Sequence, residues 1–133
     1  MDNYTSLITY IWNTLTADAT LISLMGTVRL EHIWAKPDED WPYMVERIEF
    51  NPQAGNNVEF ATLYLDIWSK SDATEALAIR TRIMELLDEK TFAPTGIVRV
   101  MIRRTQMDGF VPEVEENILH YTTKFDMRFF KYT

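Results

Sequence analysis

The histidines and glycines are the first side chains to consider for chemistry in this 133-residue chain. His32 and His120 lie far apart and form neither an HxH nor an HxxxH spacing, so the sequence predicts no histidine pair for a metal ion. The glycines are isolated from one another, which gives no support for a phosphate-binding loop or a dinucleotide fingerprint. Cysteine is absent, which excludes disulfides, thiolate metal sites and cysteine nucleophiles.

Acidic side chains are numerous, but their spacing matches no known site. The run Asp38-Glu39-Asp40 lacks the spaced oxygen ligands and central glycine of an EF-hand loop, so a solvated loop is the favoured interpretation. Carboxylate pairs for acid–base catalysis can form in the fold, yet 20 acidic residues also produce such pairs by chance. We therefore predict no catalytic residue, no metal site and no cofactor, and a protein that is not an enzyme.

The overall composition indicates one globular domain, residues 1–133, without membrane spans. The net charge of −7 disfavours general attraction to DNA, because that attraction comes mainly from neutralising phosphates. No segment approaches the roughly 18 consecutive apolar residues that a membrane span requires. The N-terminus has Asp2 where a secretion signal would have a positive residue, so we expect neither a membrane location nor export.

Apolar residues at three- and four-residue spacing predict three helices. The first covers residues 4–15, with Leu7, Ile8, Ile11, Trp12 and Leu15 on its apolar face. A shorter helix follows over residues 19–25 and ends at Gly26. The third covers residues 72–88 and begins with a capping box.

Alternation of apolar and polar residues predicts four main strands, over residues 42–48, 58–69, 97–106 and 118–132. A short strand is also expected near residues 28–33. The turn-rich segment 51–57 and the polar segment 107–117 are predicted to be hairpin tips.

These elements predict an α+β fold in the order α-α-β-β-α-β-β. The expected architecture is a mostly antiparallel four-stranded sheet with the helices packed on one face. Because a helix connects the second and third strands, those two should run parallel, with the last strand between them. The two hairpin tips then project from opposite ends of the sheet.

Charged and aromatic residues alternate with the core residues of these strands, on the opposite face of the sheet. The simplest interpretation is a solvated face with cross-strand ion pairs. The alternative is a subunit interface in which opposite charges fix the register between copies. Its candidate residues are Tyr64, Asp66, Trp68, Arg99, Arg103, Lys124, Asp126 and Arg128.

The order of these patterns resembles a known family over nearly the whole chain. The segments that carry the resemblance are residues 16–21, the Pro42-Tyr43 strand start, residues 65–70, the helix with Ala76-Leu77, and the closing strand 123–129. In this order they are similar to the tail-completion proteins of long-tailed bacteriophages and prophages, also called tail-terminator or head–tail joining proteins.

The resemblance implies a subunit that forms a ring, usually a hexamer, at the head-proximal end of the tail. Such a ring ends polymerisation of the tail tube and offers a docking surface to the head connector. The implied partners are further copies of the chain, the tail tube protein and the head–tail connector protein, and DNA only passes through the ring. The implied location is the virion tail, assembled in the cytoplasm of a bacterial host.

A protein that joins two different assemblies needs two binding ends, and the hairpin tips are our hypothesis for them. The first tip offers Asn51, Gln53, Asn56 and Asn57, and the second offers Asp108, Phe110, Glu113 and Glu115. The order in which they meet the tail tube and the connector stays open.

Two alternatives stay open on the sequence alone. One is another head–tail connector component, such as a stopper that seals the DNA exit. The other is a small enzyme or ligand-binding α+β domain with its site on the open sheet face. Polar groups clustered in a concave, water-accessible pocket would favour the second alternative.

Overall fold

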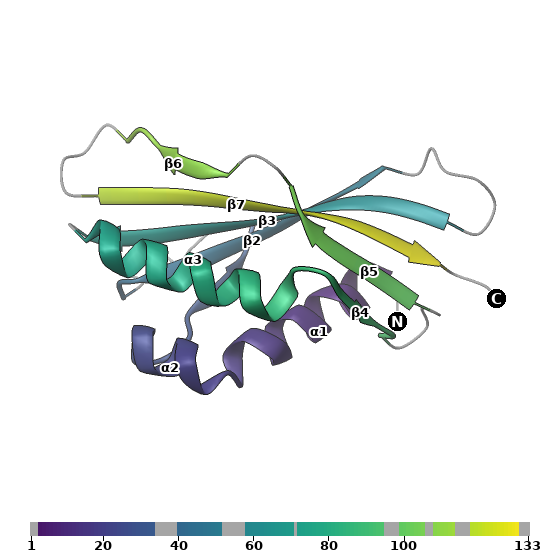
Figure 1. Ribbon diagram of the computed structural model, residues 1–133, viewed down its shortest axis with the longest axis horizontal. Coiled ribbons are helices and arrows are strands. Elements are labelled where there is room, and N and C mark those ends of the chain that lie inside the picture. Colours follow the sequence, from purple (N-terminus) through teal and green to yellow (C-terminus); the bar gives the residue numbers. More distant parts are fainter. Residues whose placement is uncertain are drawn as a thin grey trace.

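A computed structural model describes residues 3–33, 40–51, 58–70, 72–94, 99–105, 108–113 and 118–130. Three helices lie together on one side of a twisted sheet in this part of the chain (Figure 1). They are α1 (Asn3–Thr16), α2 (Ala19–Met25) and α3 (Ala73–Leu87). No helix in the described ranges is long and apolar enough to span a membrane.

Polar caps define where α2 and α3 begin. The side chain of Asp18 accepts a hydrogen bond of 2.9 Å from the backbone N–H of Leu21, and Asp72 accepts one of 3.1 Å from that of Glu75. Gly26 ends α2 with a φ of 80°, a conformation that glycine adopts without steric cost. The three helices predicted from periodicity are therefore confirmed.

The sheet contains seven strands in the described residues. The order across the sheet is β1-β2-β3-β7-β5-β4, and β6 pairs with another part of β7. The strands are β1 (Leu30–His32), β2 (Tyr43–Asn51), β3 (Val58–Lys70), β4 (Lys90–Phe92), β5 (Arg99–Arg104), β6 (Gly109–Val111) and β7 (Ile118–Phe130).

The α+β class is right, but the prediction of a mostly antiparallel four-stranded sheet is wrong. The sheet is mixed, because β1 pairs with β2 in parallel while the other neighbouring pairs are antiparallel. The strands β1, β4 and β6 have three residues each. β1 confirms the short strand expected near residues 28–33, β4 lies between the predicted elements, and β6 lies in the predicted hairpin tip 107–117. Three residues are too few to establish an alternating pattern.

The central part of the sheet follows the predicted order. β7 lies between β3 and β5 and is antiparallel to both, so β3 and β5 run in the same direction. Val58 pairs with Phe130 at one end of the ladder between β3 and β7, and Lys70 pairs with Ile118 at the other. The connection from β2 to β3 therefore leaves one end of this ladder, and β6 leads into β7 at the opposite end.

The core lies between the helices and the sheet. Alternate residues of β3 and β7 face the helices, and Leu63, Leu65, Phe125 and Phe129 have 0% exposure. They pack with the apolar face of α1, where Leu7, Ile11 and Leu15 are also fully buried. Trp12, which the periodicity placed on that face, is instead 45% exposed.

Candidate interaction surface

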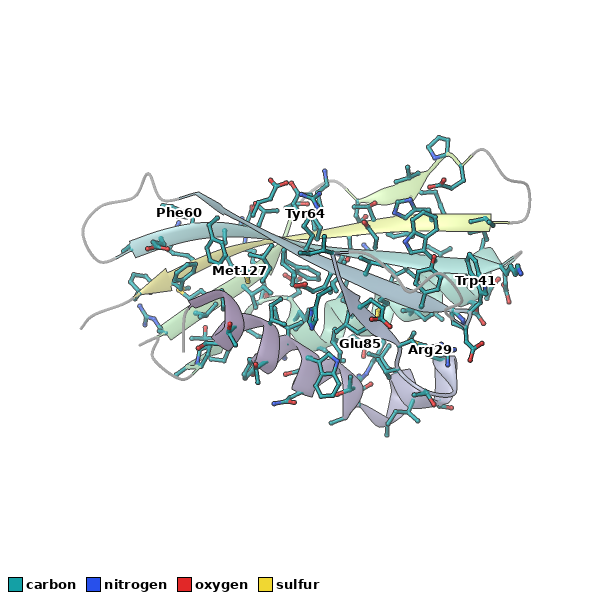
Figure 2. The ribbon with its side chains drawn as sticks, turned by 180° about the vertical axis from the view of Figure 1, so that it is seen from behind. Arg29, Trp41, Phe60, Tyr64, Glu85 and Met127 are labelled. Atoms are coloured by element: carbon teal, nitrogen blue, oxygen red, sulfur yellow. The ribbon has the colours of Figure 1, made fainter. Side chains whose placement is uncertain are left out.

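The face of the sheet away from the helices, here called the outer face, has no described helix over it (Figures 1 and 2). Its residues are those that alternate with the core residues of β3, β5 and β7. Strand register places the eight candidate interface residues on this face, with Tyr64 opposite Lys124 and Asp126 opposite Arg103. Two regions of the outer face differ in how their charges are paired.

The first region is an aromatic cluster around His120. The imidazole of His120 stacks on the indole of Trp68, with ring centroids 3.9 Å apart and planes 14° apart. Tyr43 lies beside Trp68 at 6.1 Å, and Trp41 lies 5.0 Å from Tyr43. The cluster thus joins β7, β3 and β2 through side chains as well as through the backbone.

Two carboxylates flank the ring of His120. The Nδ1 atom lies 2.8 Å from Glu113 Oε1, and the Nε2 atom lies 3.4 Å from Asp66 Oδ1. Burial of the ring favours the neutral form, but hydrogen bonding and charge attraction from Asp66 and Glu113 outweigh burial, so the pKa of His120 is raised. The charges of this region therefore have partners within the chain.

The second region is the basic patch, formed by Arg99, Arg103, Lys124 and Arg128. Three of its cations lie over aromatic rings: Arg99 is 4.6 Å from the Phe130 centroid, Arg128 is 5.2 Å from Phe60, and Lys124 is 5.6 Å from Tyr64. Within the described chain, no carboxylate lies within 4.0 Å of any of these four cations. The cross-strand ion pairs expected between the candidate residues are therefore absent from this patch in the described residues.

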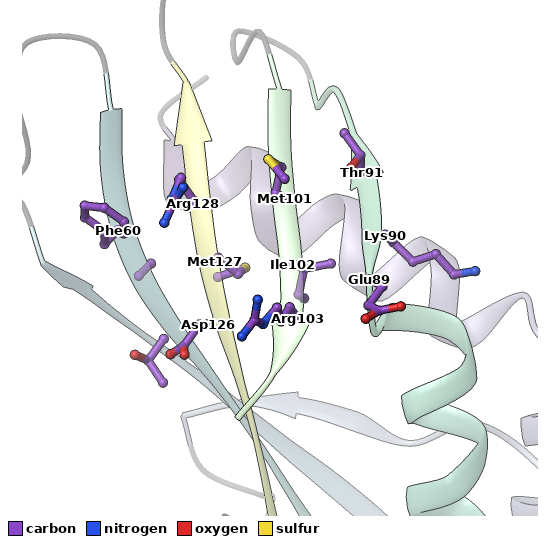
Figure 3. Close-up of a pocket in the computed structure, with 12 residues that line it drawn as sticks. Phe60, Glu89, Lys90, Thr91, Met101, Ile102, Arg103, Asp126, Met127 and Arg128 are labelled. Atoms are coloured by element: carbon purple, nitrogen blue, oxygen red, sulfur yellow. The ribbon is translucent and has the colours of Figure 1, made fainter. Parts of the chain in front are cut away.

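A hollow of about 660 Å³ adjoins the basic patch. Figure 3 shows Arg103, Arg128, Met101 and Phe60 around it on neighbouring strands, with Asp126 nearby. Thr91 and Lys90 of β4 complete the side toward the edge of the sheet. Glu89 also lines the hollow, which therefore combines apolar side chains with three cations and two carboxylates.

The end of the sheet near β6 is held by a half-buried polar contact. The Arg80 guanidinium lies 3.0 Å from Asp108, and the hydroxyl of Tyr121 donates a hydrogen bond of 2.9 Å to the same carboxylate. Burial, followed by the contact with Asp108, raises the pKa of Tyr121. Phe110 packs edge-on against Tyr121 and remains 44% exposed.

The candidate tip residues are thus only partly available to a partner. Asp108 and Glu113 contact other residues of the chain, whereas Phe110 is exposed. Asn51 is the last residue of β2. Gln53, Asn56, Asn57 and Glu115 lie outside the described residues.

The remaining groups that could do chemistry are few in the described part of the chain. The exposed His32 lies with its Nδ1 atom 3.1 Å from Oε1 of the buried Glu46. No group of three or more histidine and acidic side chains is arranged to hold a metal ion in the ranges described above.

Sequence reasoning missed several residues of this surface. The sequence predicts no role for His120 beyond excluding a metal-binding histidine pair, and Phe60 and Met101 are not among the candidate residues. The alternation that selected Tyr64 and Arg103 places Phe60 and Met101 on the same face, so it was a usable signal. The contact between His120 and Glu113 had no such signal, because it depends on how β6 leads back to β7.

Comparison with known proteins shows a shared fold. No family model and no curated protein matches the chain. A chain in the solved structure of the virion of a native gene transfer agent particle is similar, with 14% identity, 96% coverage of both chains and a TM-score of 0.78. A second solved structure, described only by a sequence identifier, is 9% identical over 99% of both chains, with a TM-score of 0.71.

Proposed function

We propose that this chain is a non-enzymatic structural protein of a phage or phage-like virion, acting as a ring at the head-proximal end of the tail. The observation that carries the proposal is the similarity in fold, along 96% of both chains, to a chain of a gene transfer agent virion. The resemblance of the sequence pattern to tail-completion proteins supports the same role independently. In that role the ring ends polymerisation of the tail tube and joins the tail to the head connector.

The outer face supports assembly into a ring. It combines aromatic side chains with the basic patch, and no described helix covers it. Interfaces between proteins are enriched in aromatic residues and arginine. We propose that its eight candidate residues lie at a contact between copies.

The two ends of the ladder between β3 and β7 support binding to two different partners. Asn51 and Val58 lie at one end of that ladder, and β6, inside the second predicted tip, pairs with β7 near the other end. We propose that one tip contacts the tail tube protein and the other the connector protein. Within the described part of the second tip, Phe110 is the exposed residue best suited to such a contact.

The proposal is tested on assembled tails. Particles made without this chain should have tails of variable, excessive length, and the purified protein added back should restore one length, as measured by electron microscopy. The protein should also bind purified tail tubes at one end. Uniform tails in its absence would contradict the proposal, and binding only to DNA-filled heads would favour a stopper.

The hollow beside the basic patch favours a second candidate, a ligand-binding domain. Its volume of about 660 Å³ lies within the range of small-molecule sites, and Arg103 and Arg128 place two cations at its rim. Thermal unfolding measured with a panel of small anionic metabolites tests this candidate. A ligand that raises the melting temperature of the wild type but not of Arg103→Ala would support it.

A further inference from the structure

We propose that the basic patch of one copy docks on the helical layer of the next copy, so that copies associate through opposite faces. This inference rests on the proposed function and specifies the contact that would build the ring. It begins with the four cations of the basic patch, which have no carboxylate within 4.0 Å in the described chain.

The uncovered outer face is large enough for a stable contact. β3 and β7 have 13 residues each. β2 has nine residues and β5 has six. At about 3.3 Å per residue and about 4.8 Å between strands, these four neighbouring strands present on the order of 650 Å². One partner of a standard interface buries about 600–1,000 Å². A face of this size with exposed aromatic rings is therefore sufficient for one subunit contact.

The charge of the chain favours a second copy as the occupant. The basic patch and the Asp126 beside it contribute four positive charges and one negative, a net of +3, while the chain carries −7. The rest of the chain thus carries −10. Any other surface of a second copy is on average acidic, and charge complementarity directs association toward such a surface.

The basic patch cannot dock on itself at low cost. A two-fold contact between two basic patches would bring like charges together in a partly dry interface. A contact between two different surfaces avoids that repulsion. Repeated from copy to copy, a contact of this kind closes into a ring if the rotation per step allows it.

The helical layer is the face that fits. The helices with their caps carry two arginines, Arg80 and Arg82, and five carboxylates: Asp18, Asp72, Glu75, Glu85 and Asp88. With Arg104, whose guanidinium lies 3.6 Å from Asp88, these groups carry a net charge of −2, opposite in sign to the +3 of the basic patch with Asp126. Leu77 on α3 is 42% exposed and lines a groove between α2 and α3 whose charged side chains are Arg82 and Glu85. Glu85 pairs with Arg82 and is still 57% exposed, so the groove offers an apolar side chain and an accessible carboxylate to the outer face.

Two variants test the contact, one on each face. The sheet variant Arg103→Glu/Arg128→Glu reverses two exposed cations, and the helix variant Leu77→Arg places a cation in the exposed groove. The conservative variants Arg103→Lys/Arg128→Lys and Leu77→Met are the controls. Circular dichroism melts verify that each variant folds, and native mass spectrometry with light scattering measures assembly.

We expect each disruptive variant alone to associate about tenfold or more weakly than the wild type, since a buried charge pair is lost or a like charge is added. Mixed in equal amounts, the two should regain association, because the intact helical face of the sheet variant can contact the intact sheet face of the helix variant. Both controls should assemble as the wild type does.

Three results would overturn the inference: assembly of either disruptive variant alone at wild-type strength, a mixture that stays monomeric, or a wild type that is monomeric at every concentration. The proposed function is decided separately, by the length of tails made without the chain. If the docking test fails but added protein still restores tails of one length, the contact is rejected and the proposed function stands.

Discussion

His120 connects three parts of the structure through one ring. It belongs to β7, stacks on Trp68 of β3, and lies between the carboxylates of Asp66 and Glu113. Its side chain is only 12% exposed, so the stabilising contacts are not fully screened by water. Protonation of this ring should therefore strengthen the attachment of the segment after β6 to the sheet.

This contact predicts a pH dependence of stability. The pKa of His120 is raised above the 6.5 of an unperturbed histidine, so its contribution is complete below pH 6.5 and is lost as the pH rises through the raised pKa. We expect the free energy of unfolding of the wild type to exceed that of His120→Gln by about 1–2 kcal/mol at low pH and by less at high pH. Urea unfolding of both proteins across this range measures the difference, and a gap that widens with pH would refute the assignment.

Asp18 has two functions that variants can separate. It caps α2 and also accepts hydrogen bonds from Arg82, with Nη2 2.7 Å from Oδ1. Those bonds, more than the N–H of Leu21, lower the pKa of Asp18 against the opposing effect of burial. The ion pair therefore stabilises the fold above the ordinary pKa of 3.8, and this stability is lost as the pH falls through the lowered pKa.

We expect Asp18→Ala to destabilise the protein by about 2–3 kcal/mol, since both the cap and the ion pair are removed. Asp72→Ala is the matched control, because Asp72 caps α3 without an arginine partner and should cost about 1 kcal/mol. If chemical unfolding shows an equal loss of stability in both variants, the ion pair between Asp18 and Arg82 contributes nothing to stability.

At the scale of elements, the four long strands and the short β1 were predicted from the sequence, whereas β4 and β6 were not. β3 and β7 alternate over 13 residues, and their buried residues agree with the predicted core faces. β1, β4 and β6 are three residues long, and their pairing depends on neighbours that are distant in sequence. The candidate surface shows the same limit. Alternation along the strands identified the outer face, whereas the partners of His120 and Asp108 could be found only from the three-dimensional structure.

β6 pairs with β7 through its three residues, Phe110 packs on Tyr121, and Asp108 fixes the segment just before the strand. This carboxylate contacts Arg80 of α3 and Tyr121 of β7 just before the strand begins. Strands held by few contacts open locally at low free energy. We therefore expect Asp108→Asn to increase hydrogen exchange at Phe110 and Val111 by about tenfold while β3 stays protected.

Mass spectrometry of exchanged peptides measures this effect. Asp88→Asn is the control, because Asp88 accepts the backbone N–H of Arg104 in β5 and does not contact β6. Equal exchange of β6 in both variants would show that Asp108 does not hold the strand.

At the scale of the whole molecule, charge is distributed unequally between the two faces. The basic patch lies on the outer face, and the helical layer on the other side has a carboxylate excess. A contact between these faces should weaken in salt, because the Debye length falls from about 30 Å at 0.01 M to about 3 Å at 1 M. We expect self-association to weaken about tenfold over this range by sedimentation, and association that strengthens with salt would indicate a contact dominated by apolar surface.

The position of β7 in the sheet also affects how the protein folds during translation. β7 is the last described strand in the sequence, yet it joins β3 to β5 at the centre. While the chain emerges from the ribosome, β3 has an open edge of 13 residues until residues 118–130 arrive. An open edge of this length is a template for pairing between nascent chains. Translation that pauses before residue 118 should therefore favour aggregation, and a separate peptide with the β7 sequence should suppress it.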